Sequence, residues 1–125
     1  MFTKEVTFED FEGKEVTRTF HFNLTKFEVL EINLIDDINE IMAATDMGRL
    51  LPAIKRIFHA AVGKRVKNEF VKSEQYSDSF IASDAFSTIM LEMIESEDPA
   101  AAAEAFIRGC LPASVRLEIA KESQK

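Results

Sequence analysis

The feature that most constrains the fold is a change in the spacing of apolar residues near residue 24. Up to that point apolar and polar side chains alternate, and beyond it apolar residues recur at every third or fourth position. Alternation is typical of strands with one buried face, whereas the longer spacing is typical of amphipathic helices. The sequence therefore predicts a short β segment followed by a helical body.

The alternating segment predicts a β-hairpin over residues 1–24. Phe8 shares one parity with the other apolar residues of the first strand, and Phe20 and Phe22 share one parity in the second. Residues 10–13, with the sequence Asp-Phe-Glu-Gly, lie between the strands and favour a turn, because glycine tolerates positive φ. A hairpin alone is marginally stable, so we expect its apolar face to pack on the rest of the chain.

Two capping patterns indicate where helices begin in residues 25–112. Thr25 and Glu28 form a capping box, in which the threonine oxygen and the glutamate carboxylate satisfy free amides at a helix start. Asp98 followed by Pro99 predicts a second start, because aspartate accepts hydrogen bonds from free amides and proline needs no amide partner at that position.

The middle of the chain gives a weaker pattern. A broad apolar stripe over residues 50–62 predicts a helix that ends at Gly63. Pro52 is compatible with that helix only if it lies in the first turn. Residues 64–74 are basic and have no sustained period, so we interpret them as a loop or a short strand.

The predicted fold class is α+β, mainly α, with the N-terminal β-hairpin packed on a compact bundle of about five to six helices. A chain of 125 residues fits one domain, and 46% of its residues are hydrophobic, which is enough for a core without disulfides or metal. We expect a single domain over residues 1–125, made of the hairpin (1–24), the helical body (25–112) and a C-terminal tail (113–125).

Charge and cysteine content exclude several classes of protein. The formal net charge is −7, and a field of that sign repels phosphate backbones, which disfavours nucleic-acid binding. Cys110 is the only cysteine, so an internal disulfide is impossible. No apolar run approaches the roughly 20 residues of a membrane span, and the charged, alternating start is not typical of a signal peptide. We therefore expect a cytoplasmic protein.

Residues that could carry chemistry lack partners in the sequence. His21 and His59 belong to no metal-binding motif. Asp36 and Glu40 could share a helical face, but they would need further ligands to hold a metal. Cys110 lies on an apolar stripe, which indicates a buried and inert thiol. The sequence therefore predicts no catalytic, metal or cofactor site, and a protein that is not an enzyme.

Six segments, taken in order and with their spacing, resemble one known family. The clearest is residues 20–28, Phe-His-Phe-Asn-Leu-Thr-Lys-Phe-Glu, a strand leading into a capped helix. The others are residues 4–8 (Lys-Glu-Val-Thr-Phe), 10–13 (Asp-Phe-Glu-Gly), 70–73 (Phe-Val-Lys-Ser), 83–87 (Ser-Asp-Ala-Phe-Ser) and 106–112 (Phe-Ile-Arg-Gly-Cys-Leu-Pro). Over this span the chain resembles the tail assembly chaperones of long-tailed bacteriophages.

The resemblance implies a set of partners. Such proteins bind the tape measure protein in the host cytoplasm, keep it soluble, help recruit tail tube subunits, and leave before the virion is complete. The family commonly makes a longer, frameshifted product, so the longer form of this chain is an expected partner, and self-association into a homo-oligomer is a further possibility. Neither a nucleic acid nor a membrane is expected as a partner.

The composition is compatible with binding of an apolar client. The chain has 11 Phe and 5 Met with a negative net charge, so it can offer apolar surface and stay soluble. We expect a client helix to lie on an apolar helix face. The candidate partner-binding residues, which cluster on the two strongest late stripes, are Met90, Met93, Ile94, Phe106 and Leu111.

Two other functions stay open at this stage. One is a structural or adaptor component of a phage tail or connector, which would be retained in the purified particle. The other is a small regulatory protein that binds nucleic acid, which the net charge of −7 disfavours.

Overall fold

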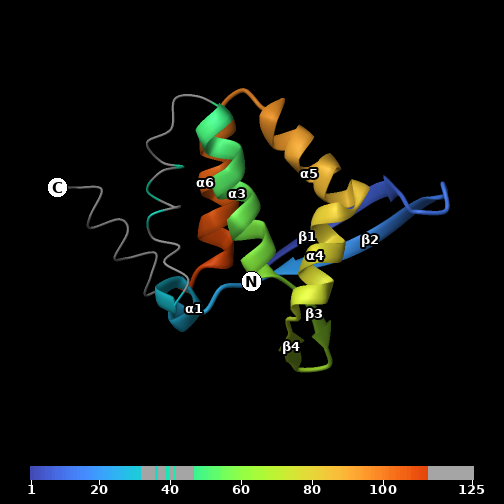
Figure 1. Cartoon of the computed structure of the whole chain (residues 1–125), viewed down its shortest axis with the longest axis horizontal. Coiled ribbons are helices and arrows are strands. Elements are labelled where there is room, and N and C mark those ends of the chain that lie inside the picture. Colours follow the sequence, from blue (N-terminus) through green and yellow to red (C-terminus); the bar gives the residue numbers. More distant parts are fainter. Residues whose placement is uncertain (32–35, 37–38, 40, 42–46, 113–125) are drawn as a thin grey trace.

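The computed structural model describes residues 1–31, 36, 39, 41 and 47–112. Glu40 and the predicted tail, residues 113–125, lie outside the described residues. Along the described part of the chain, two pairs of strands are each followed by a group of helices (Figure 1). Their bounds are β1 Phe2–Glu9, β2 Glu15–Phe22, α1 Lys26–Glu31, α3 Met47–Ala61, β3 Val62–Val66, β4 Glu69–Val71, α4 Glu74–Ala82, α5 Asp84–Ile94 and α6 Pro99–Cys110.

The predicted N-terminal hairpin is confirmed. β1 and β2 pair antiparallel along their whole lengths, with Phe2 opposite Phe22 at the open end. At the turn, the Asp10 carboxylate oxygen Oδ1 accepts hydrogen bonds from the amides of Glu12 and Lys14, each at 2.9 Å. Gly13 has φ +82°, a conformation that glycine adopts without steric cost.

The predicted fold class is wrong in one respect, because the chain is not one hairpin on a helical body. β2 also pairs with β3, and β3 with β4, giving a four-stranded antiparallel sheet in the order β1-β2-β3-β4. Residues 62–71 thus form a second hairpin within the described chain. Three of the five β3 residues are exposed, so both faces of this strand meet solvent and no alternation marks it in the sequence.

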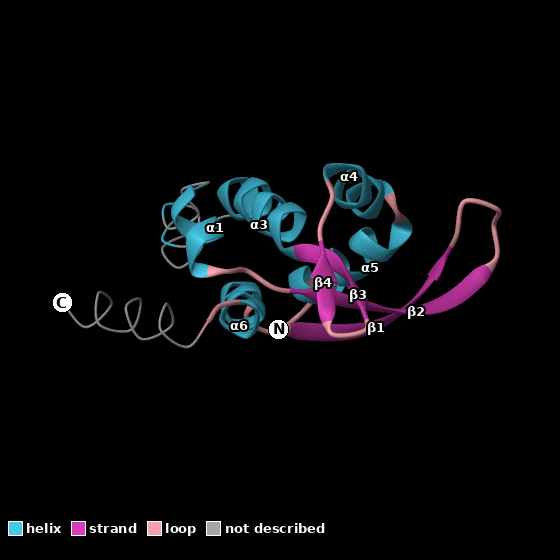
Figure 2. Ribbon diagram, turned by 90° about the horizontal axis from the view of Figure 1, so that it is seen from below, coloured by secondary structure: helices cyan, strands magenta, loops and turns pink. Residues whose placement is uncertain are grey.

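The helices pack on the sheet from one side. Figure 2 shows α4 and α5 lying over the strands, and the β1–β2 turn projecting beyond the helices. This sidedness follows from the hairpin, whose buried residues Val6, Phe8, Phe20 and Phe22 all have the same parity. The opposite face is polar and carries a hydrogen bond of 2.8 Å between the hydroxyls of Thr7 and Thr17.

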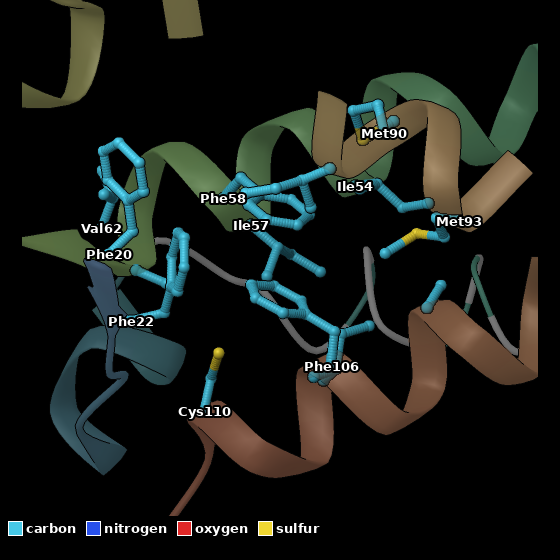
Figure 3. Close-up of a cluster of buried hydrophobic side chains, with 14 of the residues drawn as sticks. Phe20, Phe22, Ile54, Ile57, Phe58, Val62, Met90, Met93, Phe106 and Cys110 are labelled. Carbon is cyan, nitrogen blue, oxygen red and sulfur yellow. The ribbon is translucent and has the colours of Figure 1, made fainter. Parts of the chain in front are cut away.

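Phenylalanine rings make up the centre of the core. Phe22 is fully buried, and its ring contacts those of Phe58 and Phe106 (Figure 3). It also contacts the ring of Phe80. The Phe58 and Phe106 rings stack with centroids 4.0 Å apart, which joins α3 to α6. The excess of phenylalanine therefore reflects mainly a shared core between the sheet and the helices.

The predicted helix starts at Thr25 and Asp98 agree with the structure, whereas the predicted place of Pro52 in a first turn does not. The Thr25 amide donates to Glu28 Oε1 at 2.9 Å and the Glu28 amide to Thr25 Oγ1 at 3.2 Å, which completes the capping box. Asp98 caps α6 through the amide of Ala101 at 3.1 Å. Pro52, however, lies inside α3 and not in its first turn, because the helix begins earlier, at Met47.

One lysine ties three segments of the fold together. The Lys72 ammonium group donates to Glu28 Oε2 at 2.7 Å and to the backbone carbonyl of Ala60 at 2.8 Å. Lys72 follows β4, Glu28 belongs to α1, and Ala60 is in the last turn of α3. These bonds fix α1 against the end of α3 and the second hairpin.

Candidate functional site

The two histidines make ordinary surface contacts. His59 Nε2 lies 2.7 Å from Asp78 Oδ1, between α3 and α4, and His21 Nδ1 lies 3.3 Å from the Thr3 hydroxyl across the first hairpin. Within the described residues, no group of three or more His, Cys, Asp or Glu side chains is placed to hold a metal ion. Each histidine therefore makes a polar contact of a kind that is common at protein surfaces.

Cys110 lies in the last turn of α6 with its side chain in the core (Figure 3). Burial raises the pKa of its thiol to about 12, because the thiolate would lose its hydration. A nucleophilic cysteine needs the opposite shift, toward a thiolate at neutral pH. The predicted burial of Cys110 is confirmed, and its environment does not activate it.

The structure places most of the predicted partner-binding residues in the core. Met90 and Met93 of α5 are each 8% exposed, Phe106 of α6 is 5% exposed, and Leu111, after α6, is 1% exposed. Ile94 is partly buried. Figure 3 shows Met93 and Phe106 directed toward the space between α5 and α6. The role of these residues in partner binding stays a prediction.

An open apolar hollow lies beside this part of the core, and we call it the α5–α6 hollow. It has a volume of about 300 Å³, and α5, α6 and β1 form its walls. Two of the predicted residues, Met93 and Phe106, line it. The described residues that line it are Phe2, Lys4, Ile89, Glu92, Met93, Ala102, Ala105 and Phe106.

The shape and charge of the α5–α6 hollow follow from short side chains and one ion pair. Ala102 and Ala105 are three residues apart on α6, so they share a helix face and leave the space open. Lys4 Nζ lies 2.9 Å from Glu92 Oε2, which joins β1 to α5 at the rim. The hollow can therefore take apolar side chains while its edge stays polar.

Sequence reasoning missed several residues of this hollow. Phe2, Ile89 and the two alanines lie in segments that were correctly predicted as strand or helix, but no local signal shows that they border open space. The alanine run of α6 was the available hint, because small residues on one helix face permit close approach by another chain.

Among the described residues, no helix is both long enough and apolar enough to cross a membrane.

Comparison with known proteins gives one family. The sequence profile described as phage tail assembly chaperone matches residues 1–125, which is the whole chain. The chain belongs to the phage tail assembly chaperone family. No curated protein and no solved structure matches it. The family assignment agrees with the resemblance drawn from the sequence, and it makes phage tail proteins the class of partner for this chaperone.

Proposed function

We propose that this chaperone binds the tape measure protein, keeps it soluble and helps to recruit tail tube subunits. The observation that carries the proposal is the α5–α6 hollow, an open apolar surface on a chain of the tail assembly chaperone family. A long helical client exposes apolar stripes until the tube surrounds it, and such stripes need a temporary cover. Helix-in-groove binding supplies that cover.

The chemistry of the hollow suits a client helix. Met93 supplies a flexible, polarizable side chain that adapts to different apolar shapes. Ala102 and Ala105 let a second helix approach α6 closely. In this arrangement Met90 and Leu111, which belong to the buried core, act mainly from behind the surface, by holding α5 and α6 in place.

The remaining partners and the location are part of the same proposal. The chaperone acts in the host cytoplasm, alone or with its longer frameshifted form, and it is absent from the mature virion. Self-association belongs here as well, since an apolar hollow on a soluble protein can pair with another copy until a client displaces it.

Co-expression with the tape measure protein of the same phage tests the proposal. We expect the client to aggregate alone and to stay soluble, in a complex, with the wild-type chaperone. Ala105→Glu puts a charge at the mouth of the hollow without removing a buried side chain. We expect it to reduce the soluble client severalfold, because an unpaired charge in an apolar contact is costly.

The matched control is Ala101→Glu, an exposed position on the same helix that does not line the hollow. It should leave the soluble fraction of the client unchanged, with both variants checked for native helix content by circular dichroism. If the client aggregates to the same extent with and without the chaperone, at matched expression, the proposal fails. An adaptor role in the tail would then be tested by looking for the chain in purified virions.

A further inference from the structure

A second, larger hollow lies under the turn of the first hairpin. The β1–β2 turn projects beyond the helices (Figures 1 and 2), and a space of about 640 Å³ separates it from α4 and the start of α5. We call this space the hairpin groove. Its lining is Phe8, Glu9, Asp10, Phe11, Glu12, Arg18, Thr19, Phe20, Lys64, Tyr76, Ser79, Phe80, Ser83 and Asp84.

The floor of the hairpin groove is aromatic. Phe8, Phe20 and Phe80 are all buried in the core below, and their edges line the groove. The Phe8 and Phe20 centroids lie 5.9 Å apart, and those of Phe20 and Phe80 lie 5.1 Å apart. The floor is therefore continuous from the first hairpin to α4.

Phe11 stands at the rim of this floor and is 82% exposed. It lies in the turn, where it adds nothing to the core and leaves a large apolar side chain in water. An exposed aromatic residue beside an aromatic floor is the arrangement of an anchor that closes over a bound side chain.

Charge is unevenly distributed around the groove. Glu9, Asp10, Glu12 and Asp84 line it near the turn, and an adjoining small hollow shares Glu9, Asp10 and Asp84 with it. The nearby Lys14 offsets this charge weakly, since its ammonium group lies 3.9 Å from Glu12.

The lining also includes two cations. Arg18 lies over the Phe8 ring at 5.9 Å, and Lys64 lies over the Tyr76 ring at 4.9 Å. An occupant therefore meets carboxylates near the turn, phenylalanine side chains on the floor and cations beside Phe8 and Tyr76.

We propose that the hairpin groove binds an amphipathic segment of a partner protein, with its apolar side chains on the phenylalanine floor and its lysine or arginine residues at the acidic end. Charge complementarity selects this occupant, because four carboxylates face two cations in the lining. A second copy of this chain has a net charge of −7 and so lacks the surplus of cations that the acidic end of this groove favours. The proposal does not depend on tape measure binding at the α5–α6 hollow.

A synthetic peptide is the probe for this site. We would use a fluorescein-labelled amphipathic helix of about 15 residues, which spans roughly 22 Å, with a leucine stripe and three lysines near one end. Fluorescence anisotropy measures its affinity for the full chain. One control peptide has glutamate in place of the lysines, and another has glutamine in place of the leucines. We expect both to bind at least about tenfold more weakly.

Matched protein variants locate the peptide. Phe11→Ser should weaken binding about tenfold, because it removes the aromatic side chain at the rim of the groove. Phe27→Ser is its control, since Phe27 is 70% exposed on α1 and does not line the groove. Glu12→Lys should also weaken binding, and raised salt should reduce the gap between wild type and this variant.

Several results would overturn the proposal. Equal binding of the lysine and glutamate peptides would show that charge does not select the occupant. Binding unaffected by Phe11→Ser would show that Phe11 does not anchor it. Loss of binding in Ala105→Glu would place the peptide in the α5–α6 hollow instead. If sedimentation shows a dimer that Phe11→Ser dissociates, the occupant is a second copy of the chain.

Discussion

Lys72 shows how a single side chain can hold in place a helix, α1, that contributes little to the hydrophobic core. α1 has one buried residue, Val29, so its position depends on polar contacts. Burial by itself would raise the pKa of Glu28, but the hydrogen bonds from Lys72 and Thr25 outweigh it, and the pKa is lowered from 4.5. The carboxylate is therefore stabilised in the folded state relative to the unfolded chain.

We predict that Lys72→Met lowers the free energy of unfolding by about 2 kcal/mol at neutral pH, since it removes hydrogen bonds from a charged group. Because the pKa of Glu28 is lowered by folding, its contribution is present above 4.5 and is lost as the pH falls through the folded value. The stability difference between the two proteins should therefore narrow below pH 4.5, leaving the part that comes from the Lys72 hydrogen bond to the Ala60 carbonyl, which does not titrate. Urea unfolding across this pH range measures both effects.

The control for Lys72→Met is Lys14→Met, at an exposed lysine 3.9 Å from Glu12. An exposed pair contributes little, so this variant should unfold like the wild type at every pH. A stability difference between wild type and Lys72→Met that persists unchanged in acid would rule out Glu28 as its cause.

At the scale of elements, the β3–β4 hairpin depends on one close approach. A Cβ atom on Gly63 would lie 2.7 Å from Phe70 Cζ and 2.9 Å from the backbone carbonyl oxygen of Val71. Glycine at this position lets β4 and the Phe70 ring pack directly over β3. The glycine that we predicted to end a helix therefore serves mainly to admit the neighbouring strand.

Gly63→Ala should destabilise the protein by about 1–3 kcal/mol, the usual cost of overpacking against a neighbour that cannot move freely. Urea unfolding followed by circular dichroism measures the change. In a Phe70→Leu background the ring contact is absent but the Val71 carbonyl remains. We therefore expect Gly63→Ala to cost less stability in that background than in the wild type, but still to cost some. A Gly63→Ala protein as stable as the wild type would show that the hairpin can shift at no cost.

Local signals predicted some elements well and others only in part, such as residues 64–74, which we interpreted as a loop or a short strand. The Thr25–Glu28 capping box and the Asp98 cap are made of hydrogen bonds between near neighbours, so the sequence pattern contains them whole. The pairing of β2 with β3 joins Phe22 to Val62, which are far apart in the chain. Such pairing leaves no local mark, and the exposed faces of β3 hide its period.

The candidate site was predictable only in part, for a related reason. An apolar stripe shows that a helix has a neighbour, but it does not show whether the neighbour is the core or a partner. Met90 and Leu111 turned inward, whereas Met93 and Phe106 also border open space. The distinction depends on the small side chains of Ala102 and Ala105, which line the same hollow as Met93 and Phe106 and leave it open.

At the scale of the whole molecule, one ring connects the sheet to the helices. Phe22 lies on β2 with no exposed surface, and its neighbours come from β1, α3, α4 and α6. Their rings are those of Phe2, Phe58, Phe80 and Phe106, with centroids 5.3 to 6.1 Å from that of Phe22. Each hollow is lined in part by these elements, the α5–α6 hollow by β1 and α6 and the hairpin groove by β1, β2 and α4, so the geometry of both depends on this contact.

Phe22→Ala should therefore destabilise the whole molecule and not one segment. We expect a loss of about 3–5 kcal/mol, a large share of the roughly 5–15 kcal/mol that holds a domain together. Phe27→Ala, at an exposed phenylalanine on α1, should stay within about 0.5 kcal/mol of the wild type. Hydrogen exchange distinguishes destabilisation of the whole molecule from destabilisation of one segment. In Phe22→Ala, protection of the amides should fall together in the sheet and in α3, α4 and α6. If protection falls in β1 and β2 alone, the hairpin is a separate unit, and the two hollows can be altered independently.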